Sequence, residues 1–252
     1  MLPIKKTIYT LNINNYAPDI VKYTYPLFKH YANKIGADFK VITERKYPEW
    51  DMEYERLQMY DMAKQDKNDW TLMFDADVII HPETIDFTSI LHKDTVFHPG
   101  LDMSLIRFKP DVYMLRDGRF KAPGNWMAIA SDWCLDLWHP VEPDITQAEL
   151  ESRITVSNFE LSGTAPVKAK HLIGDYILGS NISRYGLKVI TAPEIYEKHN
   201  IVGSNFFFHD NTSAYRDKVK NIEKIVVEWE LHRMVPQLPL IHNIQFSLLD
   251  KQ

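Results

Sequence analysis

The stretch Trp70-Thr-Leu-Met-Phe-Asp75-Ala-Asp77-Val-Ile-Ile80 carries the sharpest pattern in the chain. Its first five residues form a short, mostly apolar run, which is typical of a strand buried on both faces. Two carboxylates, Asp75 and Asp77, follow where that strand ends. Burial and mutual repulsion disfavour two unpaired negative charges there, and a divalent cation resolves the conflict. Carboxylate oxygens suit Mg²⁺ or Mn²⁺ and leave positions for phosphate oxygens, whereas the plainer interpretation is a pair of solvated turn aspartates.

The residues before this stretch alternate strand and helix patterns. We expect strands and helices in this order: strand 7–13, helix 18–36 with a kink or break at Pro26, strand 38–43, helix 54–64 and strand 70–74. Such an alternation predicts a parallel or mostly parallel sheet covered by helices. Ligands of these sheets bind beyond the carboxyl ends of the strands, which is where Asp75 and Asp77 stand.

The second half of the chain is less regular. We expect strands at 126–131, 187–190 and 201–208, and helices at 132–137, 147–153, 171–185 and 221–234. Residues 101–125 contain two prolines and two glycines, which indicates a long functional loop or lid. Within it, residues 107–121 interleave basic and aromatic side chains, which fits either a grip on an anionic acceptor or an ordinary solvated loop.

Composition excludes several classes of protein. With 252 residues, 45% of them hydrophobic and 25% charged, the chain can bury a core and is not intrinsically disordered. The net charge of −5 gives the surface as a whole no attraction for nucleic acid or anionic membranes. A single cysteine, Cys134, excludes a disulfide within the chain, and the absence of any Gly-x-Gly excludes the dinucleotide and P-loop fingerprints. No signal peptide or membrane-spanning stretch is readable, so we expect a cytoplasmic protein.

A strand that ends in Asp-x-Asp, after an opening strand–helix–strand unit, resembles the GT-A glycosyltransferases, and among them the glycogenin-like and the α-galactosyl and α-xylosyl transferases. The resemblance covers roughly residues 5–220. It implies a GT-A-like α/β fold, with a mostly parallel central sheet flanked by helices in a single Rossmann-like domain. Within residues 1–252 it implies a nucleotide-sugar-binding half (about 1–100), a merged acceptor half (about 101–220), and a C-terminal helix and tail (221–252).

The resemblance also implies a metal site. In this family the aspartates hold Mn²⁺ or Mg²⁺ on the diphosphate of a nucleotide-sugar, so Asp75 and Asp77 are the expected ligands. The segment Phe206-Phe-Phe-His209 ends a late strand, where the family often supplies a third ligand, although His209 is equally interpretable as a satisfied strand-end histidine. Arg216 and Lys218 are expected to steady the leaving diphosphate. Here the sequence departs from the glycogenin-like pattern His-x-x-Gly-x-x-Lys, because Thr212 stands at the glycine position.

The remaining expected site residues concern the donor. The family pattern implies that the nucleotide-sugar is bound by residues that follow strands or precede them: Asn12, Tyr16, Thr43, Arg56, Asp75 and Trp126. Arg56 precedes the Asp-x-Asp strand and could reach a phosphate or the aspartates. Asp175 is expected near the transferred sugar, as a hydroxyl ligand or as the base of an inverting enzyme, and helix capping is the alternative.

The resulting prediction is a metal-dependent glycosyltransferase, moving a hexose or pentose from a nucleotide-diphosphate donor, with UDP implied by the resemblance. Its acceptor could be a glycan, a lipid-linked group or a hydroxymethylated nucleobase. A phosphatase of the haloacid dehalogenase type is one alternative, because Asp75 and Asp77 also fit its first motif, although Gly179 replaces the last aspartate of its Gly-Asp-x-x-x-Asp. A non-catalytic nucleotide- or sugar-binding module is the other, but it has no need of paired carboxylates at a strand end.

Overall fold

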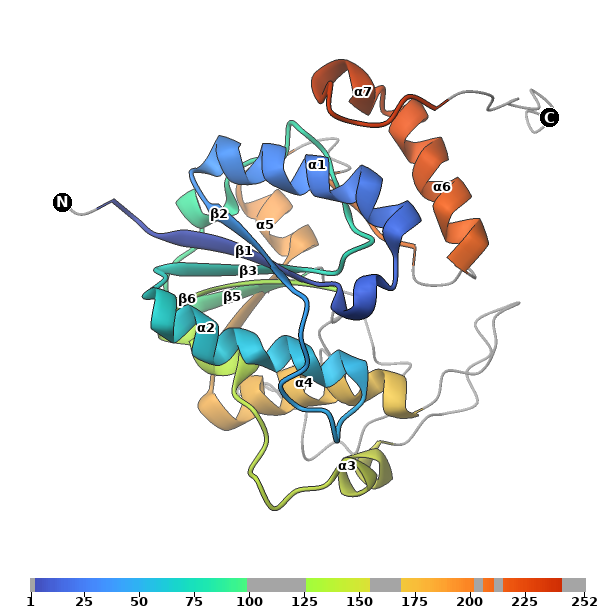
Figure 1. The fold of residues 1–252 in the computed structure, drawn as a ribbon. Helices are drawn as coiled ribbons and strands as arrows, with labels where there is room; N and C mark the ends of the chain where they lie inside the picture. Colours follow the sequence, from blue (N-terminus) through green and yellow to red (C-terminus); the bar gives the residue numbers. More distant parts are fainter. Residues whose placement is uncertain (1–2, 99–125, 155–168, 202–205, 211–214, 242–252) are drawn as a thin grey trace, which may run out of the picture.

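The computed structural model describes residues 3–98, 126–154, 169–201, 206–210 and 215–241, and it contains a six-stranded sheet with helices on both faces (Figure 1). The sheet has the order β2-β1-β3-β6-β5-β7. Its strands are β1 (Lys6–Leu11), β2 (Asp38–Ile42), β3 (Trp70–Phe74), β5 (Thr95–His98), β6 (Met127–Ser131) and β7 (Lys188–Thr191). β1 runs parallel to β2 and β3, and β5 runs parallel to β7, whereas β6 is antiparallel to both of its neighbours. The predicted mostly parallel α/β fold is therefore confirmed.

The helices form two layers. They are α1 (Pro18–Ile35), α2 (Gln58–Asp66), α3 (Gln147–Arg153), α4 (Ile173–Tyr185), α5 (Ala192–Lys198), α6 (Tyr215–Glu228) and α7 (Leu231–Met234). α1 and α5 lie over one face of the sheet, and α2 and α4 lie over the other (Figure 1). α6 packs against the outer side of α1 through an apolar cluster that includes Ile222 and Val226. None of the helices in the described ranges has the length and hydropathy of a membrane span.

The core follows the alternation of side chains along each strand. In β3, Leu72 and Phe74 point toward α1, while Met73 points toward α2 and α4. All five residues of β3 are buried, as expected for a strand covered by helices on both faces. In β6, the small side chains Ala128 and Ala130 lie in the same apolar cluster as Met73 and residues of α2 and α4. The middle of the sheet is therefore rigid, and it fixes the position of whatever follows Phe74.

A second, two-stranded sheet extends the molecule beyond the end of β3. β4 (Ile79–Ile80) pairs antiparallel with β8 (Phe207–Phe208), and Ile79 and Ile80 are fully buried. The His81 N–H also donates to the carbonyl of Phe206, over 2.9 Å. This pairing brings a segment from late in the chain to the loop that carries the two aspartates.

Several predicted element boundaries were wrong. Helix α1 is not broken at Pro26, since its buried face stabilises it despite the missing N–H donor. The predicted helix 54–64 is a 3₁₀-helix over Met52–Leu57 followed by α2. The predicted helix 221–234 is two helices, α6 and α7, because Glu230 adopts a left-handed backbone conformation (φ 51°) between them.

Other differences concern short elements. The patterns of β4, β5 and α5 were not recognised as elements in the sequence. Of the predicted strand 201–208, the described strand is only Phe207–Phe208, and residues 202–205 lie outside the described residues. The predicted lid over 101–125, including the basic and aromatic stretch 107–121, also lies outside them.

Candidate metal centre

The two aspartates of the Asp-x-Asp motif lie in a tight turn at the carboxyl end of β3. The Asp75 N–H donates to the carbonyl of Trp126 (2.8 Å), and the Val78 N–H donates back to the Asp75 carbonyl (3.1 Å). From α1, the Thr24 hydroxyl donates to the carbonyl of Ala76 over 2.6 Å. The turn is thus held from three sides. The carboxylates are only partly accessible, with 24% of the Asp75 side chain and 12% of the Asp77 side chain exposed.

His209 reaches this turn because it follows β8. Its Nε2 lies 3.3 Å from Asp77 Oδ1, and its imidazole stacks on the Trp126 indole with ring centroids 5.1 Å apart. Its Nδ1 is buried and has no hydrogen-bond partner among the described residues. Asp75, Asp77 and His209 each offer one ligand atom, and these atoms lie within 4.8 Å of one another. Two carboxylates and an imidazole form a donor set that suits Mn²⁺ or Mg²⁺, so the residues fit the predicted metal.

Each aspartate also has a cationic partner. The Arg56 guanidinium lies 3.2 Å from Asp75 Oδ1, and only 8% of the Arg56 side chain is exposed. The Lys218 ammonium, which projects from α6, donates to Asp77 Oδ2. Burial lowers the pKa of the Arg56 guanidinium, but the charges of Asp75, of Glu53 and of Asp175, the third residue of α4, outweigh it and raise that pKa. The site is therefore a cluster of alternating charges, which partly compensates the cost of burial.

The environments of the two aspartates push their pKa values in opposite directions. Burial raises the pKa of Asp75, and Arg56 opposes that rise only in part. Burial acts on Asp77 as well, but His209 and Lys218 outweigh it and hold the pKa of Asp77 below its ordinary value. Asp77 is therefore the carboxylate that stays ionised most readily, which is what a metal ligand requires.

The other residues predicted to bind the nucleotide-sugar differ in how far they are buried. Asn12 is buried after β1, where its N–H donates to the Ile42 carbonyl (2.9 Å). Tyr16 is 53% exposed, and desolvation together with the charges of Asp75 and Asp77 raises its pKa, so it lies at the rim of the site. Thr43 and Arg216 are exposed, and no interaction among the described residues joins either of them to the aspartates.

Glu53 belongs to this site but was not predicted. It stands three residues before Arg56 in the 3₁₀-helix, and this spacing puts the two side chains on one face. Burial raises the pKa of Glu53 to about 7, with the Arg56 charge opposing the rise and the Asp75 charge adding to it. The one signal in the sequence is the Glu-x-x-Arg spacing, and Glu53 stands one residue before the predicted helix 54–64.

Glu53→Gln is expected to stabilise the protein at alkaline pH. Because the native pKa of Glu53 exceeds the unfolded value of roughly 4.3, the wild-type protein loses stability as pH rises from about 4 to 7. The glutamine removes that loss. The free energy of unfolding of the variant minus that of the wild type should therefore be about 1–2 kcal/mol larger at pH 8 than at pH 4.5. Urea unfolding at both pH values measures this. Glu49→Gln, at an exposed glutamate nearby, should show no such change, and equal differences at both pH values for Glu53→Gln would refute the assignment.

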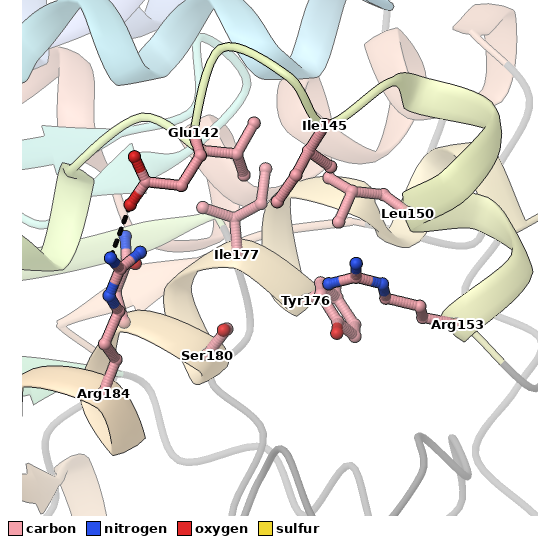
Figure 2. Close-up of a pocket in the computed structure, with 10 residues that line it drawn as sticks. Glu142, Ile145, Leu150, Arg153, Tyr176, Ile177, Ser180 and Arg184 are labelled. Carbon is pink, nitrogen blue, oxygen red and sulfur yellow. Dashed lines mark hydrogen bonds and ion pairs between the residues drawn. The ribbon is translucent and has the colours of Figure 1, made fainter.

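A separate hollow of about 100 Å³ lies between α3, α4 and the loop before α3 (Figure 2). Its apolar wall includes Ile145, Leu150 and Ile177. Arg184 and Arg153 stand at its two ends, and they pair with Glu142 and Glu149. Ser180 and Arg184 project from the face of α4 that is turned away from Asp175, since residues advance by about 100° each along a helix. This hollow is therefore not part of the metal centre.

Comparison with known proteins points to the same architecture. No protein-family model matches the sequence, and no curated protein sequence matches it. A crystal structure of a glycosyltransferase involved in the glycosylation of the major capsid of PBCV-1 is similar over 88% of this chain and 100% of that chain, with 14% sequence identity and a TM-score of 0.50. The galactosyltransferase LgtC, in complex with donor and acceptor sugar analogs, aligns over 89% of this chain and 99% of that chain, with 11% identity and a TM-score of 0.46.

At 14% identity, the similarity to the PBCV-1 glycosyltransferase is one of fold. It extends over 88% of this chain and the whole of that chain. The carboxylate pair stands at the carboxyl end of β3, where open α/β sheets bind their ligands. The chain therefore has a GT-A-like α/β fold, similar to that of the PBCV-1 glycosyltransferase.

Proposed function

We propose that this protein is a metal-dependent glycosyltransferase, which moves a sugar from a nucleotide-diphosphate donor to an acceptor hydroxyl. The observation that carries the proposal is the cluster of Asp75, Asp77 and His209, whose ligand atoms lie within 4.8 Å of one another at the carboxyl end of β3. Lys218 and Arg56 add two positive charges beside the carboxylates. A site with both metal ligands and cations suits a diphosphate, which carries several negative charges.

The proposed roles follow from the chemistry of each side chain. When bound, the metal ion stabilises the negative charge that develops on the departing diphosphate. Lys218 adds a second positive charge to the same oxygens, and Arg56 keeps Asp75 in position through their ion pair. Asp175, buried at the first turn of α4, is proposed to accept hydrogen bonds from hydroxyls of the transferred sugar. Trp126 supports the site by stacking on His209.

The finer parts of the proposal concern the ligands. We propose Mn²⁺ or Mg²⁺ as the metal and a UDP-sugar as the donor, with Asn12, Tyr16 and Thr43 on the nucleotide side. Arg216, exposed on the first turn of α6, is proposed to contact the diphosphate from solvent. The acceptor is proposed to be a hydroxyl of a glycan.

The phosphatase alternative has less support from the side chains. A phosphatase of that type needs a lysine beside its nucleophilic aspartate. Lys168 and Lys170, which precede Gly174-Asp175, are the two lysines that resemble the later motifs of that family. Lys170 pairs with Asp51 over 4.0 Å, and Lys168 lies outside the described residues. The cation beside Asp75 is Arg56.

A nucleotide and a metal ion together are expected to raise the melting temperature. A ligand at one hundred times its Kd stabilises the folded state by about 2.7 kcal/mol, which for a chain of this size corresponds to a shift of about 5–10 °C. Thermal melting with UDP, GDP, ADP and their sugar conjugates, each with Mn²⁺ or with EDTA, measures this. We expect the shift for UDP or a UDP-sugar and only with metal.

Two outcomes would contradict the proposal. If no nucleotide raises the melting temperature, with or without metal, the proposed nucleotide-sugar donor is wrong. A shift produced instead by Mg²⁺ with a phosphate mimic such as beryllium fluoride would favour the phosphatase. Release of UDP from a UDP-sugar, in the presence of metal and candidate glycans, then tests transfer itself.

A further inference from the structure

Both oxygens of the Asp77 carboxylate already have partners. His209 Nε2 lies 3.3 Å from Oδ1, and the Lys218 ammonium donates to Oδ2. The pair is shielded from water, with 18% of the Lys218 side chain and 12% of the Asp77 side chain exposed. Charges in such surroundings interact more strongly than surface charges do. A metal ion that binds Asp77 must therefore compete with a cation that is already in place.

The helix that carries Lys218 is firmly held. Ile222 and Val226, on later turns of α6, are fully buried against α1. Glu223 accepts a hydrogen bond from the Tyr23 hydroxyl over 2.7 Å. Asn221 donates to Asp210, the residue after His209, over 2.6 Å. Because the backbone of α6 is fixed, the lysine can leave Asp77 only by moving its own flexible side chain.

Each of the two aspartates is paired with a cation, and two further acids, Glu53 and Asp175, act on Arg56. Arg56 and Lys218 contribute two positive charges, and Asp75 and Asp77 contribute two negative ones. A divalent cation among these four groups would add two positive charges next to Lys218, and it would break the Lys218–Asp77 pair. A diphosphate brings the negative charge that offsets the metal and offers the lysine new oxygens to bind.

We propose that the Lys218 ammonium, through its ion pair with Asp77, competes with the metal ion until a nucleotide diphosphate binds. The metal and the diphosphate therefore bind cooperatively. This inference rests on the proposed function, since it requires a diphosphate ligand. Lys218 blocks the metal in the empty site and turns to the diphosphate in the loaded one. Each ligand then raises the affinity of the site for the other by the same factor.

The test is the affinity for Mn²⁺ in the absence of any substrate turnover. Free Mn²⁺ is measured by electron paramagnetic resonance during titration of the protein, with and without UDP. For the wild-type protein we expect UDP to increase the Mn²⁺ affinity about tenfold or more, a typical coupling factor. Lys218→Met should bind Mn²⁺ alone about tenfold more tightly than wild type, and UDP should then add little.

Two further variants serve as controls. Lys220→Met removes a lysine from the same helix whose side chain is 62% exposed and pairs with Asp217, so it should bind Mn²⁺ like the wild-type protein. Lys218→Arg keeps the positive charge and should retain the weak binding of Mn²⁺ alone. Far-ultraviolet circular dichroism of each variant shows whether the fold is preserved.

The outcomes separate this inference from the proposed function. Suppose that the wild-type protein binds UDP with Mn²⁺, but Lys218→Met binds Mn²⁺ alone no more tightly than the wild type does. Lys218 then does not compete with the metal, and the inference is wrong. The same holds if wild-type protein binds Mn²⁺ equally well with and without UDP. If UDP fails to bind under every condition, the proposed function fails first.

Discussion

Asp77→Asn is expected to abolish metal-dependent sugar transfer while the fold stays intact. The substitution keeps the shape of the side chain but removes the charge that a metal ligand supplies, and it also frees Lys218 from its partner. Loss of one preorganised electrostatic contact commonly lowers kcat by about 10²–10³-fold, and we expect the upper end because the metal itself is affected. The measurement is release of UDP from a UDP-sugar over a range of Mn²⁺ concentrations.

The stability of this variant provides an internal check. Because the native pKa of Asp77 lies below its unfolded value, its charge stabilises the folded state above about pH 4, and this contribution is lost as pH falls through the native pKa. Asp77→Asn should therefore be less stable than wild type at pH 7, by about 1 kcal/mol, with a difference that shrinks below pH 4. Asp69→Asn, at the opposite end of β3, should keep full activity. If Asp77→Asn keeps full activity, the proposed metal centre is wrong.

Arg56→Met is expected to cause a large loss of stability. The guanidinium is almost fully buried beside Asp75, and removing one member of a buried ion pair leaves the other charge uncompensated. Such losses are about 3–5 kcal/mol, and the partial exposure of Asp75 favours about 3 kcal/mol here. For a chain of this size that corresponds to a drop in melting temperature of about 6–12 °C, which calorimetry would measure.

The pH dependence of the Arg56 variant identifies the cause. Without Arg56 the pKa of Asp75, already raised by burial, rises further, so the variant loses stability as pH rises from the unfolded value of about 4. The defect should therefore be smaller at pH 5 than at pH 8, and Asp75→Asn in the same chain should recover part of it. Arg184→Met, at a pair with Glu142 in which both side chains are about half exposed, should cost under about 1 kcal/mol. A loss equal to that of Arg184→Met would show that the buried pair adds no stability.

The sequence predicted best the elements whose hydrophobic pattern has a clear start and end within a few residues. β3 was predicted with its observed bounds because an apolar run ends abruptly at Asp75, and α3 because its helical pattern is closed at both ends. The strand–helix alternation of the first half was enough for a mostly parallel sheet. The reversal of β6 was not predicted, since direction depends on how a strand enters the sheet and not on its own residues.

The site was predictable only in part, for a related reason. Asp75 and Asp77 are separated by one residue, so one motif reveals both. The contact between Asp77 and Lys218 joins residues 141 positions apart, and no local pattern indicates it. Glu53 lies in a 3₁₀-helix that begins at Met52, before the predicted helix 54–64, and its raised pKa arises from burial that the sequence does not display.

The short pairing of β4 with β8 has a consequence for how the protein folds. This ribbon of two residues on each side is what brings His209 to the aspartates, from a point far along the chain. Because contacts between residues far apart in sequence form more slowly than local ones, we expect this pairing to form after the neighbouring strands β1, β2 and β3 have associated. During refolding, the far-ultraviolet signal of the sheet should therefore return before the capacity to bind Mn²⁺. We therefore expect the proposed metal centre to be completed only after the central sheet has folded.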